Sequence, residues 1–411
     1  MSASTAPHRA SAGLLAAILL VGLSLRPALT SVSPLLTAIR DATGMSYPLA
    51  SMLTVLPVLT MGGFALLAGP ALGRWLGERH GIAAGLLVIG LACAMRFVVT
   101  DTAWLIATAA VAGCGIAVIQ ALMPGVIKQH YAARTATAMG FYSAAIMGGG
   151  GLGAAFSPWI AHCFHNWHAG LGAWSAIAAA GLLLWWQSPR PAMSRRDTTA
   201  ATVSTRAFLR LPRARALALY FGMINSVYAS MVAWLPSFYM QHGRDAQASG
   251  ALLACMTACQ VVAALALPWL ARRNPDRRRW LTVGMALMLA GILGLIISPM
   301  RGAVAWVSAV GLGLGGTFAL SLILTLDHLD RPESAGQLGA FVQGAGFMVA
   351  AASPFATGWI LDLCGSFTPA WIVLALGMAV LMVMTWRFAP EGYRRAMSKP
   401  SGVDVLEVVS T

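Results

Sequence analysis

The chain alternates between long apolar runs and short polar intervals. A helix needs about 20 mostly apolar residues to cross the hydrocarbon core of a bilayer. Twelve runs approach or exceed this length, and each predicts a membrane-spanning helix: 12–37, 48–71, 82–98, 103–127, 136–160, 168–187, 214–239, 246–271, 279–298, 303–326, 335–360 and 368–388. The runs do not alternate with period two, which excludes a membrane β-barrel. The pattern therefore predicts an all-α membrane protein with twelve transmembrane helices.

The longest polar interval, between residues 187 and 215, divides the predicted helices into two sets of six. Positions in the first set recur in the second at an offset of about 198, so that Gly113 and His130 correspond to Gly311 and His328. Such a repeat indicates two pseudo-symmetric six-helix bundles. We expect four segments: a first bundle at 1–187, a cytoplasmic linker at 188–213, a second bundle at 214–397 and a mobile cytoplasmic tail at 398–411.

Composition agrees with a membrane location. Of the 411 residues, 58% are hydrophobic and 10% are charged, whereas a soluble domain has about 25% charged residues. The net charge is +14, and 22 of the 27 basic residues fall on one side of the predicted helices, with four on the other. Cytoplasmic loops carry such an excess, so both termini are expected in the cytoplasm. The basic clusters lack interleaved aromatic residues, so we expect no nucleic-acid partner.

Arg26 falls near the middle of the first predicted helix. The apolar stretch before it resembles a signal peptide, but no clean cleavage site follows, so we read it as a retained helix. A guanidinium stays charged, and a mid-membrane position costs about 2.5–3.5 kcal/mol on insertion scales. No Asp or Glu lies mid-membrane to neutralise it. Either an anionic or electron-rich substrate supplies the counter-charge, or Arg26 bonds helix carbonyls and water and only fixes packing; we favour the first.

Other polar residues interrupt the apolar helices. Thr30 follows Arg26 at i+4 and lies on the same helix face. Asn225 occupies the corresponding position in the seventh helix, and Tyr228 shares its face. Lone amide or hydroxyl groups occur in four further helices, and each is either a substrate ligand or an interhelical hydrogen-bonding group: Gln120, Tyr142, Gln260 and Gln343.

Other kinds of site are not indicated. The glycine runs at 148–153 and 311–316 resemble dinucleotide-binding fingerprints, but those follow a strand, so we interpret these runs as close helix packing. His162, His165 and His168 have a spacing that permits a metal, but a solvated outer loop is favoured. No nucleophile with an acid or base partner is visible. We therefore expect no cofactor, no metal site and no enzymatic activity.

Seven stretches carry a recognisable pattern: Leu25–Leu36, Leu53–Gly63, Gln120–Lys128, Met147–Pro158, Tyr220–Asn225, Ala233–Pro236 and Leu326–His328. Together they resemble the cyanate/nitroimidazole (CynX/NimT) transporters of the major facilitator superfamily, and the cyanate branch most. The resemblance covers nearly the whole chain. It implies the major facilitator fold, an inner-membrane location, and carriage of a small anion such as cyanate by alternating access. It also implies substrate-binding roles for Arg26, Asn225, Tyr228 and Gln343.

One loop departs from the superfamily pattern. The usual loop between the second and third helices has Asp followed by Arg, whereas Gly73 and Arg74 stand here. Arg272 corresponds to Arg74 in the second half, and we expect both arginines at the cytoplasmic gate. The missing Asp argues against gating by that loop's usual charge relay.

The expected partners are a small-molecule substrate and the lipid bilayer, and the expected state is a monomer. The alternative function is efflux of neutral heteroaromatic compounds of the 2-nitroimidazole type. The sequence leaves the direction of transport open, and also the choice between uniport, exchange and proton coupling.

Overall fold

The computed structural model describes residues 12–67, 69–131, 135–188, 205–271, 274, 276–329, 332–393 and 397. The regular elements in these ranges are helices. The first half contains α1 (Ala12–Ser24), α2 (Pro27–Thr30), η1 (Ser33–Leu35), α3 (Leu36–Thr43), α4 (Tyr47–Leu67), α5 (Gly69–Met95), α6 (Thr102–His130), α7 (Thr135–Cys163), α8 (Trp167–Gly172) and α9 (Ser175–Gln187).

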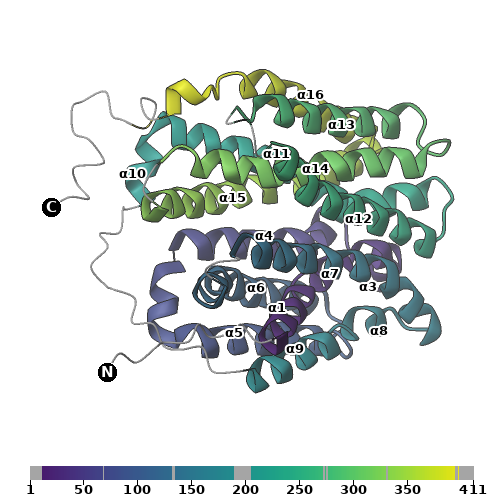
Figure 1. The fold of residues 1–411 in the computed structure, drawn as a ribbon. Helices are drawn as coiled ribbons and strands as arrows, with labels where there is room; N and C mark the ends of the chain where they lie inside the picture. The colour runs from purple at the N-terminus through teal and green to yellow at the C-terminus, as the bar shows by residue number, and fades with distance from the viewer. Residues whose placement is uncertain are drawn as a thin grey trace.

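The second half begins with a short helix in the predicted linker. Its elements are α10 (Thr205–Arg210), α11 (Pro212–Gln241), α12 (Ala246–Ala271), α13 (Arg278–Ile297), α14 (Ala303–Leu326), α15 (Pro332–Cys364), α16 (Thr368–Thr385) and η3 (Pro390–Gly392). Figure 1 shows this half, in teal to yellow, above the first half, in purple to blue. We call the end of the bundle where α10 lies the linker end; α8 lies at the opposite end.

The spans agree approximately with the predicted twelve. Eleven stretches of the described residues are long and apolar enough to cross a membrane, and they match every predicted span except the fifth. The 29-residue helix α7 occupies the fifth position. The third span begins at Gly77, where a φ of 66° divides α5. Glycine adopts this left-handed conformation without a Cβ clash, so the chain turns there from the first part of α5 into the span.

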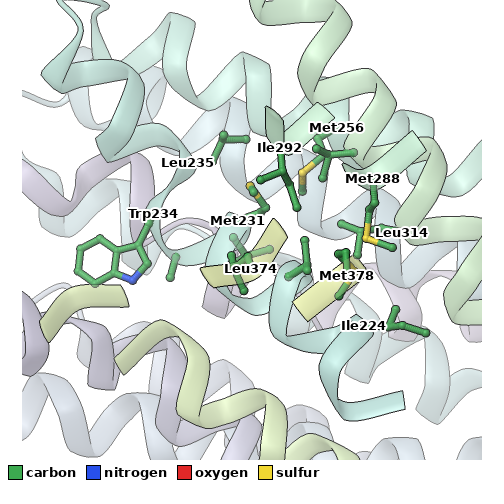
Figure 2. Packing of buried hydrophobic residues seen from close by; sticks show 14 of the residues in the cluster. Ile224, Met231, Trp234, Leu235, Met256, Met288, Ile292, Leu314, Leu374 and Met378 are labelled. Carbon is green, nitrogen blue, oxygen red and sulfur yellow. The ribbon is translucent and has the colours of Figure 1, made fainter. Parts of the chain in front are cut away.

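Two hydrophobic cores hold the helices together. One lies almost wholly in the first half and includes Ile18, Leu86 and Trp185. The other is centred on the second half, where Met256 and Met288 pack with neighbouring aliphatic side chains (Figure 2). Methionine fills irregular gaps between helices because its unbranched side chain adapts its shape.

The two halves meet along α7 with α12 and along α4 with α15. Glycines bring these helices close: a Cβ on Gly250 of α12 would strike the Ala154 carbonyl of α7. On the other interface, a Cβ on Gly62 would lie 3.0 Å from the Gly344 carbonyl oxygen. Small residues allow this close approach. In lipid, where no hydrophobic force acts between helices, the resulting van der Waals contacts stabilise their association. The two halves therefore make close backbone contacts at both the α7–α12 and the α4–α15 interface.

Candidate functional site: a substrate-binding centre

The first helix is broken in the middle of its span. Pro27 and Pro34 lack the N–H that a helix interior requires. The Val32 N–H bonds to the Leu29 carbonyl at 3.4 Å and not to that of Ala28, so the Ala28 carbonyl leaves the helical ladder. Irregular backbone at membrane depth is tolerated only where it is buried in protein or lines a cavity. The break is buried in protein, which satisfies this condition, and it is the candidate centre of the site.

Arg26 lies at this break, and its side chain reaches the other half of the protein. Its Nη1 donates a hydrogen bond to the Tyr228 hydroxyl of α11 at 3.3 Å. The guanidinium carbon is 5.1 Å from the centroid of the Tyr228 ring, within the range of a cation–π contact. The contact joins helices 1 and 7, as the repeat indicates, but through Tyr228 and not through Asn225, the residue at the position corresponding to Arg26.

Two more of the predicted residues surround Arg26. The Thr30 hydroxyl donates to the Arg26 carbonyl at 3.2 Å, which ties α2 to the break. Tyr142 of α7 is buried, its hydroxyl has no hydrogen-bond partner among the described residues, and it lies within electrostatic range of Arg26. Gly150 on the same helix faces Arg26, since a Cβ there would lie 3.4 Å from the Arg26 Cβ. Arg26 therefore has one buried hydroxyl near it that is free to donate.

No described acid neutralises Arg26. The two ion pairs in the described part of the chain join Arg277 to Asp327 at 3.3 Å and Arg278 to Asp276 at 2.7 Å. Both lie near the linker end of the second half, beside α13 and the end of α14. The charge of Arg26 is therefore balanced, within the described residues, only by the Tyr228 hydroxyl and ring. A charged residue at membrane depth without an acidic partner marks a candidate functional site.

The other predicted ligands make no recorded contact with the arginine at the break. Asn225 is buried and donates its Nδ2 to the Phe221 carbonyl of its own helix at 2.8 Å. Gln260 is buried, and its Oε1 has no partner in the described part of the chain. Gln120 and Gln343 are half-buried on α6 and α15. Substrate-binding roles for these four residues stay predictions.

The predicted gating arginines are not described at the level of side chains. Arg74 lies on the first part of α5, where the structure describes the backbone alone, and Arg272 lies outside the described residues. Arg79, five residues further along α5, is described with its side chain. Its guanidinium donates to the Trp186 carbonyl and stacks 5.5 Å from that ring, which ties this region to α9.

Arg96 is one of the four basic residues that the sequence assigns to the side opposite the cytoplasm, and the structure places it in the turn that follows α5. The side chain is completely buried behind the broken helix. Its Nη1 donates to the Ala28 carbonyl at 2.8 Å, and its Nε donates to the Thr108 hydroxyl at 3.0 Å. The sequence contains a signal for this burial, because Arg96 falls inside the predicted span 82–98.

The glycine runs pack helices closely, as predicted. A Cβ on Gly149 would strike the Leu23 carbonyl, and one on Gly311 would strike the Met256 carbonyl. Both runs lie inside helices, α7 and α14. Among the described residues, no group of three His, Cys, Asp or Glu side chains is arranged to hold a metal ion.

A histidine joins three elements at the linker end. His328, just after α14, is buried; its Nδ1 pairs with the Leu324 carbonyl at 2.7 Å, and Arg213 donates to its Nε2 at 3.0 Å. Its ring stacks on Tyr393 at 4.1 Å. Burial, with the Arg213 charge, lowers the pKa of His328 to about 4, against the opposing bond to Leu324. The imidazole is therefore neutral and fixed with its proton on Nδ1.

Long helices in two packed halves, with a charged residue at a break in the first helix, define a helical membrane transporter with duplicated halves. The chain belongs to the Major Facilitator Superfamily, whose family model matches residues 14–347. It is therefore a multi-pass membrane transporter of a small-molecule substrate, and not an enzyme.

Similar proteins indicate which group within this superfamily the chain belongs to. The chain is 45% identical to the cyanate transport protein CynX of Escherichia coli K12, over 92% of this chain and 97% of that one. It is 29% identical to a 2-nitroimidazole transporter of the same organism, over 90% and 93% of the two chains. Among solved structures, a D-xylose–proton symporter matches with a TM-score of 0.75 at 13% identity, over 92% of this chain and 98% of that one. The cyanate/nitroimidazole group predicted from the sequence is confirmed.

Proposed function

We propose that this protein carries cyanate or a similar small anion across the inner membrane by alternating access, with Arg26 as the anion-binding residue. The observation that carries the proposal is a half-buried arginine at a broken membrane helix, without an acidic partner among the described residues. The similarity to a cyanate transport protein supports the same substrate class.

The neighbours of Arg26 suit a compact linear anion. A guanidinium offers several N–H donors in a planar fork. The hydroxyls of Tyr228 and Tyr142 can each donate a further hydrogen bond, and neither is engaged with an acid in the described residues. Hydrogen bonds to an ionised acceptor are shorter and stronger than neutral ones. An anion here would meet donors from the break in the first helix, from α7 and from α11.

The same geometry supports alternating access. Arg26 belongs to the first half, and Tyr228 belongs to the second. An anion held between them contacts both bundles, so rocking one bundle against the other changes the side from which the anion is reached. A second candidate is efflux of a neutral heteroaromatic compound. The aromatic ring of Tyr228 beside Arg26 and the 2-nitroimidazole relative favour this alternative.

Binding and transport measured side by side separate the two candidates. The purified protein is placed in sealed proteoliposomes, and uptake of labelled cyanate is compared with uptake of 2-nitroimidazole and with protein-free vesicles. We expect saturable cyanate uptake that excess unlabelled cyanate inhibits and 2-nitroimidazole leaves unchanged. Uptake of 2-nitroimidazole alone would replace the proposal with the neutral-solute alternative, and uptake of neither would reject both.

The proposed orientation has both termini in the cytoplasm, and rests on 22 of the 27 basic residues lying on one side of the spans. Reporter fusions in the 187–215 interval and after residue 398 should both report cytoplasm. A periplasmic signal from either fusion would contradict the arrangement of two bundles with six spans each. We further propose a monomer that does not bind nucleic acid, which light scattering of the purified protein with and without added DNA would check.

A further inference from the structure

A second arginine, Arg96, also contacts the broken helix, and its side chain is completely buried. Arg26 leaves the break toward α11, whereas Arg96 approaches it from the end of α5. Ala28, which accepts the hydrogen bond from Arg96, lies two residues after Arg26. The two arginines therefore act on the same short stretch of backbone from different helices.

Arg96 donates the hydrogen bond that the Ala28 carbonyl lacks in the broken helix. In a regular helix the Ala28 carbonyl would accept from the Val32 N–H, but that N–H bonds to Leu29. A buried carbonyl without a donor is costly. The Nη1 of Arg96 supplies the donor at 2.8 Å, so the broken conformation of helix 1 and the position of the guanidinium depend on each other.

The Arg96 side chain is itself held in one place. Its Nε donates to the Thr108 hydroxyl of α6 at 3.0 Å, and Thr108 in turn donates to the Leu105 carbonyl at 2.6 Å. The residue is 0% exposed, and the described residues offer it no acid. A buried charge is retained at a cost, so a role in packing alone would be served as well by an apolar side chain.

We propose that Arg96 is a positioning residue for anion binding: it caps the freed Ala28 carbonyl and thereby fixes the break that presents Arg26. This inference rests on the proposed function of Arg26, and adds a residue that does not touch the anion. It requires that Arg96 influence affinity only through Arg26. Without Arg96, the backbone after Pro27 either recovers helical hydrogen bonding or becomes more open. In both cases the Arg26 guanidinium is no longer held against Tyr228.

A double-mutant cycle tests this dependence. Cyanate affinity is measured by calorimetry for Arg96→Gln, Arg26→Ala and the double variant. We expect Arg96→Gln to weaken binding about 10-fold, the size of one lost charge-assisted contact, and the double variant to bind no more weakly than Arg26→Ala. Losses that multiply in the double variant, or an unchanged affinity in folded Arg96→Gln, would overturn the proposal. The matched control is Arg244→Gln, an arginine that stacks on Tyr239 and should leave affinity unchanged.

A second measurement does not need a substrate. Ser31, at the end of α2, is 0% exposed, and Ser31→Cys is nearly isosteric. Labelling of this cysteine by N-ethylmaleimide, followed peptide by peptide with mass spectrometry, reports the geometry of the break. We expect labelling at least several-fold faster with Arg96→Gln than with Arg96 intact; equal rates reject the positioning role. If wild-type protein fails to bind cyanate, this assay still decides the role of Arg96 separately from the proposed function.

Conservative variants cover the case in which Arg96→Gln fails to fold. Arg96→Lys keeps a donor for Ala28 but loses the second contact. Thr108→Val removes the acceptor of the Nε bond, together with the bond from the Thr108 hydroxyl to the Leu105 carbonyl. We expect both to fold, to label faster at position 31 and to bind cyanate a few-fold more weakly. Folded variants with unchanged labelling and affinity would reject the proposal.

Discussion

The first and seventh helices hold corresponding places in the two halves, yet only the first is broken. α11 runs without interruption from Pro212 to Gln241, and its interior proline, Pro236, lies close to its end. The first helix has Pro27 and Pro34 in the middle of its span and divides there into short pieces. A proline near a helix end disturbs few hydrogen bonds, whereas two prolines in mid-span free several carbonyls.

The side chains at the corresponding positions differ in the same sense. Arg26 extends from the break and contacts the opposite half at Tyr228, whereas Asn225 turns back and bonds to the Phe221 carbonyl of its own helix. The duplicated fold has therefore become asymmetric: one half carries the charge on an irregular backbone, and the other provides a continuous wall. The following predictions test this division, from the largest expected effect to the smallest.

Removing the charge should have the largest effect on binding. Arg26→Ala and Arg26→Gln should weaken cyanate binding by roughly 10- to 100-fold for each charge-assisted hydrogen bond lost, without loss of purified yield. Arg26→Lys should keep part of the affinity because it keeps the charge without the planar fork. Calorimetry and thermal stability decide between a binding and a packing role, with Arg301→Ala, an exposed arginine, as the control. Normal affinity in folded Arg26→Ala would remove this residue from the site.

The broken helix should tolerate no added bulk from α7. Gly149→Ala places a Cβ against the Leu23 carbonyl, and overpacking of this kind costs about 1–3 kcal/mol. The thermal midpoint of the purified protein should fall. Gly148→Ala is the neighbouring control, since its Cβ would meet only the Leu23 Cδ2 at 3.8 Å. Equal midpoints for the two variants would contradict a tight contact between α7 and the first helix.

The wall in α11 should contribute less than the charge. Tyr228→Phe removes the hydroxyl that accepts from Arg26 but keeps the ring, so affinity should fall by about 2- to 10-fold, as for one ordinary hydrogen bond. Tyr239→Phe on the same helix removes a hydroxyl that bonds to the Pro299 carbonyl at 3.4 Å, and should not change affinity. A loss as large as that of Arg26→Ala would contradict the proposed asymmetry.

The second half should also respond, more weakly, to acid through His328. The pKa of His328 lies near 4, below the ordinary value of 6.5, so the unfolded state binds more protons between these values and the stability of the fold falls as pH drops through this window. The thermal midpoint of wild-type protein should therefore fall more steeply from pH 7 to pH 5.5 than that of His328→Gln. Equal slopes for the two proteins would contradict a buried, neutral His328.

Much of the fold follows from local features of the sequence. Apolar runs such as 246–271 and 303–326 coincide with α12 and α14, because crossing lipid requires a helix that satisfies its own backbone hydrogen bonds. Boundaries were less accurate where polar segments are helical too, as with α10 inside the predicted linker. Contact of Arg26 with helix 7 is also indicated, since a lone charge in an apolar run demands a partner and the repeat points to that helix. The repeat points to Asn225, however, whereas the contact is made by Tyr228.

The sequence by itself determined the membrane class and the duplicated helices, and it predicted a functional role for Arg26. Tertiary structure decided that the first helix breaks while the seventh continues, and that Arg96 is buried against the Ala28 carbonyl. It also decided that Asn225 turns inward on its own helix. Spans depend on the hydropathy of consecutive residues, which a sequence displays directly. Hydrogen bonds between residues 68 positions apart, as from Arg96 to Ala28, depend on how helices pack, and packing has no local signature.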